Sequence, residues 1–178
     1  KYYFDIADTH EGNFARPVPI WTVRSEFEDA IIETLENSFG ELDDTSDLAA
    51  ALLSATKNAV EDNLPDYLDQ LHYYKENSSL EELDAFNIEV LYRRTVEASV
   101  GYMLLTRCGI APELYFSDDD FRCVAEFNTP NTLNTLGLAT GDIAQMCLTE
   151  ISRTVLPLQR QMEKENRTFA HQPEREYS

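Results

Sequence analysis

The sequence contains few cysteines, few glycines and few basic residues, and each shortage excludes a class of function. Its three cysteines, Cys108, Cys123 and Cys147, form no CxxC or CxxH pair, so neither a disulfide framework nor a zinc cage is indicated. The six glycines are dispersed, which leaves no glycine-rich loop to hold a phosphate. No stretch approaches about 18 consecutive apolar residues, and the beginning, KYYFDIADTHEG, has no signal-peptide hydrophobic region. We therefore expect a cytoplasmic protein that uses no cofactor and enters no membrane.

Positive charge is scarcest in the first half of the chain. The sequence has 33 acidic and 14 basic residues, a net charge of -19. Residues 1–90 contain 21 of the acids and 5 of the bases, whereas residues 91–178 contain 12 and 9. An acidic surface repels nucleic acids and anionic lipid headgroups and attracts basic proteins. We therefore predict a basic protein partner and no direct contact with nucleic acid.

Apolar residues recur with helical spacing through almost all of the chain. The pattern predicts a helix that ends at Gly40, a second helix capped by Ser46, and a third with Pro65 in its first turn. Ser79 and Glu82 form the sequence of a capping box, which predicts a short helical segment there. A long helix should follow over residues 87–108. It is apolar on more than one side and should therefore pack against several neighbours.

Gly101 lies inside that long helix, where it costs about 1 kcal/mol relative to alanine. This cost predicts a close approach of the backbone of another helix. Ser117 should begin one further short helix, and Thr129 with Pro130 should begin another. The last long helix carries an apolar stripe over residues 144–158, and Pro157 should kink it or end it.

These patterns predict an all-α fold, with a single helical domain of about six or seven helices. Residues 1–12 should form an N-terminal strand and loop, residues 13–162 the helical domain, and residues 163–178 a polar tail or linker. The strand candidate YYFDIA, residues 2–7, has no partner strand in the sequence, so its backbone needs pairing from outside. We therefore expect that strand to belong to a preceding domain of a longer protein.

Several runs of the sequence resemble one segment of very large proteins from integrative conjugative elements of Firmicutes. The runs are KYYFDIADT, PIWTVRSEFEDAIIETLENSFG, RRTVEASVGYMLLTRCG, EFNTPNTLNTLG and LTEISRTV, and the resemblance covers residues 1 to about 156. In those proteins the segment follows an ArdC-type antirestriction domain and precedes helicase and adenine-specific DNA methylase regions. The resemblance implies a role in DNA transfer or antirestriction, with catalysis in neighbouring domains. The HExxH signature of an ArdC-like metallopeptidase is absent from this sequence.

The sequence offers few metal-ligand patterns. The three histidines, His10, His72 and His171, are far apart and outside any HExxH or HxH motif. The most ligand-like cluster is near the N-terminus, and we interpret it as a solvated loop; it consists of Asp5, Asp8, His10 and Glu11. The beginning of a calcium-binding loop is similar to the run Asp118, Asp119 and Asp120. However, Cys123 occupies the position at which such a loop requires glycine. Helix capping explains the three acids more simply.

Catalytic patterns are equally scarce. None of the cysteines has a histidine nearby in sequence, which indicates structural thiols. Two pairs of carboxylates could in principle form a catalytic pair, namely Glu81 with Glu82 and Glu97 with Glu150. An acidic helical protein contains many such pairs by chance. Arg93 and Arg94 precede Glu97 by one helical turn and predict an ion pair with it. We therefore predict no catalytic, cofactor-binding or metal-binding residues.

The second half of the chain is the only candidate for nucleic-acid binding. Its net charge is -3, so binding to DNA would not be driven by the release of counterions from the phosphates. We therefore interpret its arginines as solvated or ion-paired. The residues in question are Arg93, Arg94, Arg107, Arg122, Arg153 and Arg160, with Tyr92, Tyr102 and Tyr115.

Three functional hypotheses remain open at this point. The first is a non-enzymatic helical interaction or spacer module, in contact with neighbouring domains of a larger protein. The second is an acidic DNA mimic that inhibits a restriction or nuclease enzyme, which requires carboxylates in rows on one surface. The third is an enzyme or metal site that no sequence motif reveals, which requires at least three converging ligands or catalytic groups.

Overall fold

The computed structural model describes residues 20–21 and 23–170, and 77% of these residues are helical, with no strand among them. This confirms the all-α class. The elements are α1 (Ser25–Phe39), α2 (Leu48–Asn63), α3 (Pro65–Tyr74), α4 (Ala85–Arg107), the 3-10 helix η2 (Pro112–Leu114), α5 (Asp118–Phe121), the 3-10 helix η3 (Arg122–Glu126) and α6 (Pro130–Ala170). The expected strand at residues 2–7 lies outside the described residues.

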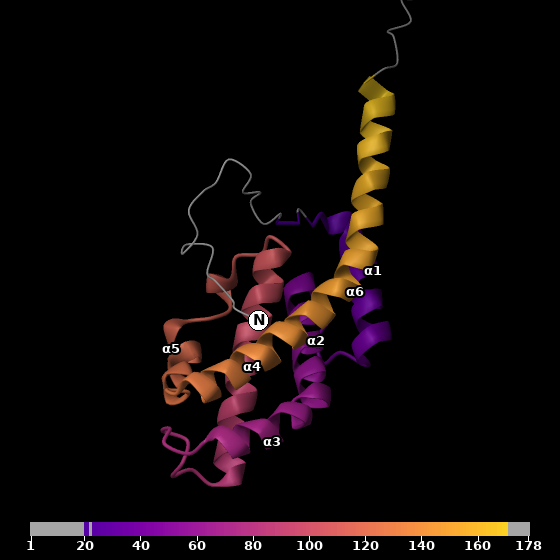
Figure 1. Cartoon of the computed structure of the whole chain (residues 1–178). Coiled ribbons are helices and arrows are strands. Elements are labelled where there is room, and N and C mark those ends of the chain that lie inside the picture. The colour runs from indigo at the N-terminus through magenta and orange to yellow at the C-terminus, as the bar shows by residue number, and fades with distance from the viewer. Residues whose placement is uncertain (1–19, 22, 171–178) are drawn as a thin grey trace, which may run out of the picture.

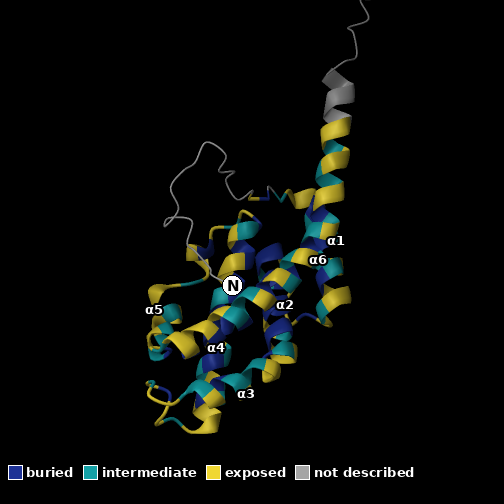
Figure 2. Cartoon of the chain, in the orientation of Figure 1, coloured by how far each residue is buried: buried dark blue, intermediate teal, exposed yellow. Residues whose placement is uncertain are grey.

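Four helices enclose the core. α6 packs against α4 and α1, while α2 packs against the same two helices. Figure 1 shows α6 crossing obliquely over the other helices before it continues alongside α1. The buried residues of each helix face inward, as the dark blue portions of Figure 2 show. Tyr92 of α4 is fully buried in this core, and its hydroxyl donates a hydrogen bond to the carbonyl oxygen of Thr135 in α6, 3.1 Å away.

The predicted first helix is confirmed by its burial pattern. Phe27, Ile31 and Leu35 are buried, and the polar residues between them are on the opposite side of α1. Gly40 follows with a φ of 83°, a left-handed conformation that glycine adopts without strain, and its N–H donates to the carbonyl of Glu36. The second helix also forms, but its cap is Asp47, one residue after the predicted Ser46.

The long fourth helix contacts neighbours on several sides, as its apolar faces predict. It packs against α2, α6 and α5 and also touches both 3-10 helices. At Gly101 the close neighbours are side chains, whereas we had expected the backbone of another helix. A methyl group added to Gly101 would lie 3.0 Å from Leu53 of α2 and 3.0 Å from Phe116.

Two sequence predictions about helices are wrong. The first is the capping box at Ser79, because residues 76–83 form turns. Ser79 instead exchanges two hydrogen bonds of 2.9 Å with the side chain of Asn128, and the carboxylate of Glu81 accepts from the N–H of Asn77. Since these bonds occupy the groups that a helix start would need, the segment from Lys75 to Asp84 remains a connection between α3 and α4.

The second error concerns the C-terminal region, where one helix of 41 residues replaces the two that the pattern predicts. It begins after Thr129, as expected, because the Thr129 hydroxyl accepts from the N–H of Thr132 at 3.2 Å. Pro157 lies inside α6 and does not end it. Figure 1 shows α6 changing direction along its length, which fits a proline that cannot donate to the carbonyl of Arg153. Residues 163–170, predicted as tail or linker, are helical.

The first described residues pack at the end of α4. The backbone N–H of Trp21 donates to the carbonyl of Arg107 at 2.9 Å, and the guanidinium of Arg107 lies 4.6 Å from the centre of the indole ring. Trp21 is almost completely buried there. In the part of the chain that the structure describes, no helix is both long enough and apolar enough to span a membrane.

Candidate functional site

The residues considered as metal ligands do not come together. Within residues 20–21 and 23–170, no three His, Cys, Asp or Glu side chains form a group that could hold a metal ion. The carboxylate of Asp120 accepts hydrogen bonds from the N–H and the hydroxyl of Ser117 at 2.8 and 3.0 Å, which confirms the predicted capping role. His72 is half-buried in α3. The N-terminal cluster of Asp5, Asp8, His10 and Glu11 and the third histidine, His171, lie outside the described residues.

Burial keeps two of the three cysteine thiols, Cys108 and Cys147, in their neutral form. Cys108 and Cys147 are buried in the core, and the loss of solvation raises the pKa of each thiol to about 12. A thiol with such a pKa contains almost no thiolate at neutral pH and is a poor nucleophile. Cys123 is partly exposed on η3. The two buried cysteines therefore serve as apolar core residues.

The two carboxylate pairs have different environments. Glu81 and Glu82 both line an open polar hollow together with Ser78, Ser79 and Asn128. Glu97 and Glu150 line two separate hollows, so the structure does not bring them together. Glu150 forms an ion pair of 2.5 Å with Arg153.

Glu97 lacks the ion pair that the spacing of Arg93 and Arg94 predicts. Arg93 instead binds Glu61 of α2 at 3.1 Å and Glu89 of its own helix at 2.8 Å. Burial raises the pKa of Glu97, and the nearby cations Arg93, Lys57 and Arg94 oppose this shift. The carboxylate of Glu97 thus lies among cations without a hydrogen bond to any described residue.

The basic and aromatic residues of the second half lie in different environments. Arg122 pairs with Asp119, and Tyr92 is buried in the core. Three further arginines have acidic or aromatic neighbours, as described for Arg93, Arg107 and Arg153. Arg94 and Arg160 are exposed, and so are Tyr102 and Tyr115.

The most distinctive surface feature is a row of carboxylates on α1. Glu26, Asp29, Glu33 and Glu36 are all exposed, opposite the buried side of the helix. At 3.6 residues per turn the four side chains fall within about 80° of one another and span about 15 Å along the axis. Among the described residues, the one cation paired with this row is Arg24, 3.8 Å from Glu26, and both of these side chains are more than half exposed. We call these four residues the α1 carboxylate row.

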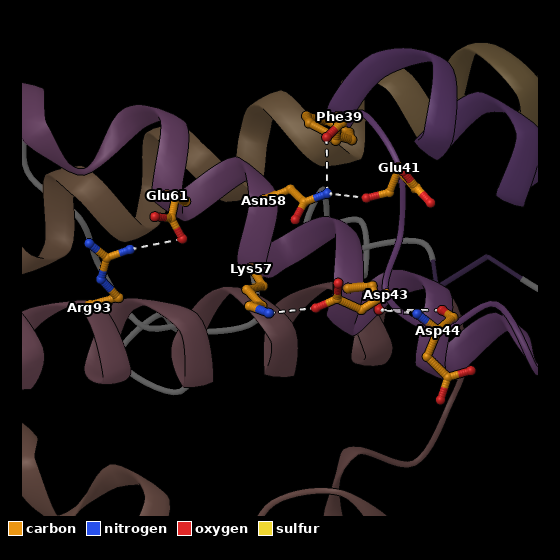
Figure 3. A network of polar contacts seen from close by, with 9 residues as sticks. Phe39, Glu41, Asp43, Asp44, Lys57, Asn58, Glu61 and Arg93 are labelled. Atoms are coloured by element: carbon orange, nitrogen blue, oxygen red, sulfur yellow. Dashed lines mark hydrogen bonds and ion pairs between the residues drawn. The ribbon is translucent and has the colours of Figure 1, made fainter.

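The segment that follows α1 extends the negative surface and is firmly attached to α2. The side-chain amide of Asn58 donates to the carbonyls of Phe39 and Glu41, at 3.1 and 2.9 Å. Lys57 binds the carboxylate of Asp43 at 2.5 Å, and Figure 3 shows these contacts joining α2 to the segment. The acids of residues 41–47 are therefore presented on a fixed backbone.

Residues 25–84 contain 17 acids and only two basic residues, Lys57 and Lys75. Lys57 is already engaged by Asp43, and Lys75 reaches the carbonyl of Leu83 at 3.5 Å. Most of the negative charge on α1, α2, α3 and their connections therefore has no cation to neutralise it within the described residues. The composition of the sequence predicted this negative charge. No sequence pattern indicated that Asn58 holds the segment after α1 in place.

Comparisons with family models, with curated proteins and with solved structures found no match to this chain. The fold and the candidate surface are therefore interpreted from the residues and contacts of the chain itself.

Proposed function

We propose that this domain is a non-enzymatic helical interaction module of a mobile-element protein for DNA processing or antirestriction. Its negative surface, from α1 to the beginning of α4, binds a basic protein. The α1 carboxylate row supports this proposal most strongly, because four exposed acids share one side of a helix almost without cations. The mobile-element setting comes from the sequence resemblance alone.

The row is costly for the fold, which favours a function for it. Carboxylates three or four residues apart on a helix repel each other by about 0.2–0.5 kcal/mol per pair. The row contains three such pairs, Glu26 with Asp29, Asp29 with Glu33, and Glu33 with Glu36. A surface that destabilises its own helix is expected where binding to an oppositely charged partner compensates for it.

The row also favours a second candidate, an inhibitor that mimics DNA. Its carboxylates follow one another at about 5 Å along the helix axis, compared with about 3.4 Å per phosphate along one DNA strand. A protein groove that binds DNA could accept such a line of charge. This candidate differs from the first only in its partner, a restriction or nuclease enzyme bound through its DNA groove.

Binding measurements with purified basic proteins test both candidates. The panel should contain restriction endonucleases, with lysozyme as a cationic protein that has no DNA groove. We expect one or more panel proteins to bind the wild-type domain more tightly than lysozyme does, and a Glu33→Gln/Glu36→Gln variant to bind them less tightly. Binding should also weaken between 50 and 500 mM NaCl. Equal affinity of the variant and the wild type for every panel protein would contradict the proposal.

Duplex DNA separates the two candidates. If the domain is a DNA mimic, a duplex that contains the recognition site should displace it from the endonuclease, and the domain should inhibit plasmid cleavage. If the domain is an interaction module, it should bind together with the duplex and leave cleavage unchanged.

A further inference from the structure

The hollow beside Glu97 lies between α2, α4 and the beginning of α5. Its volume is about 310 Å³, and it is separate from the polar hollow at Glu81 and Glu82. Its walls include Leu53 and Thr56 of α2, Glu97 and Ala98 of α4, and Phe116 and Asp120. It therefore combines an apolar wall with two carboxylates.

The apolar wall is held in place by its neighbours. Phe116 contacts Gly101, where the absence of a side chain leaves room for the ring. The centres of the Tyr102 and Phe121 rings lie 6.3 and 5.9 Å from that of Phe116. These spacings fall within the range of favourable aromatic contacts. The ring of Phe116 is half-buried, so part of it remains accessible at the hollow.

Glu97 is the half-buried acid of this hollow. The described residues provide it with no hydrogen bond, since Lys57 binds Asp43 and Arg93 binds Glu61 and Glu89. A carboxylate that has lost part of its hydration without gaining a partner is unfavourable in the free protein. A ligand that donates hydrogen bonds to it would remove that penalty.

We infer that this hollow receives an arginine side chain of the basic partner, with its guanidinium group paired to Glu97 and its flat face against Phe116. This inference rests on the proposed function and names an anchor point for it. A planar guanidinium group can bind a carboxylate through two hydrogen bonds and can also stack on an aromatic ring. Lysine offers a compact charge without a flat face.

The hollow is also lined by two cations, Lys57 and Arg94, so an acidic ligand would compete with arginine for it. Both are exposed, and Lys57 is bound to Asp43. An acidic ligand would pair with Arg94, whereas an arginine ligand would be repelled by it. The net charge of -19 favours the cationic ligand, because acidic partners are repelled by the surface as a whole.

An NMR titration of the ¹⁵N-labelled domain with N-acetyl-L-arginine N-methylamide tests the inference. We expect the largest amide shifts at Thr56, Ala98 and Gly101, and weaker binding of the corresponding lysine probe. Glu97→Gln should weaken arginine binding about tenfold, as expected for the loss of one charge-assisted hydrogen bond. Phe116→Leu should also weaken it while retaining an apolar wall. Arg94→Gln should strengthen it, because the competing cation is removed.

Glu33→Gln is the matched control, since it removes the same charge from the α1 carboxylate row and should change arginine binding less than twofold. Shifts centred on α1, or unchanged affinity in Glu97→Gln, would overturn the inference. The inference would also be overturned if N-acetyl-L-glutamate N-methylamide bound more tightly than the arginine probe and Arg94→Gln abolished that binding. The proposed function fails by a different result, namely panel binding that is insensitive to the α1 carboxylate row, so the two failures are distinguishable.

Discussion

Replacing Glu33 and Glu36 with glutamine is expected to stabilise the folded domain while weakening its binding to basic proteins. Glu33 has like-charged neighbours at Asp29 and Glu36, and each pair contributes a repulsion of about 0.2–0.5 kcal/mol. Glu36 also lies in the last turn of α1, where the helix dipole disfavours a negative charge by about 0.3–1 kcal/mol. The double variant should therefore gain about 0.7–2 kcal/mol in free energy of unfolding.

Thermal and urea unfolding at low salt measure this gain. For a chain of this size each kcal/mol moves the melting temperature by about 2–4 °C, so a rise of about 1–8 °C is expected. In 1 M NaCl charges are screened over about 3 Å, and the difference should largely disappear. Glu113→Gln removes an exposed charge from η2, outside the row, and serves as the control. A stability gain that persists in 1 M NaCl, or no gain at low salt, would refute the electrostatic explanation of the row.

Three further outcomes are expected from the core and the helix caps. Tyr92→Phe should lower the free energy of unfolding by about 1 kcal/mol in urea titrations, because it removes one buried hydrogen bond between α4 and α6. A thiol reagent should modify Cys123 in the native protein and reach Cys108 and Cys147 only after unfolding, since burial raises the pKa of both buried thiols to about 12; rapid reaction of all three native thiols would contradict this. Hydrogen bonds at the start of α4 lower the pKa of Asp84 in the folded protein. The ionised Asp84 therefore stabilises the fold fully when the pH is above its pKa in the unfolded chain, about 3.9, and this stabilisation is lost as the pH falls through the lower pKa of the folded state. Below pH 4 the urea midpoint of the wild type should therefore fall more than that of Asp84→Asn, which retains a capping side chain without the titrating group.

Local signals in the sequence predicted most of the helices. The sequence correctly indicated the buried side of α1, the stop at Gly40, Pro65 in the first turn of α3 and a helix start at Ser117, all of which are fixed by residues within one or two helical turns. The apolar pattern of α4 likewise predicted neighbours on several sides. Such features can be read from the sequence because they depend on helical periodicity and short-range hydrogen bonds.

Several errors and omissions arose where a distant residue decided the outcome. The capping box at Ser79 failed because Asn128, 49 residues away, binds the Ser79 backbone and side chain. Gly101 correctly indicated a close neighbour, but the sequence could not show that Leu53 and Phe116 fill the space. The hollow beside Glu97 is formed by residues from three separate segments, so no sequence motif could predict it.

The helix α6 has a mechanical consequence beyond its part in the core. The yellow end of α6 extends past the other helices in Figure 1, and Pro157 lies before that end with no N–H to complete the hydrogen-bond ladder. From Pro157 to Ala170 the helix axis measures about 20 Å, so a rotation of about 10° at the proline would displace Ala170 by about 3–4 Å. A small change in the helix angle at Pro157 would therefore displace the end of α6 by several ångströms, although Leu158 and Met162, just beyond the proline, still pack against the core.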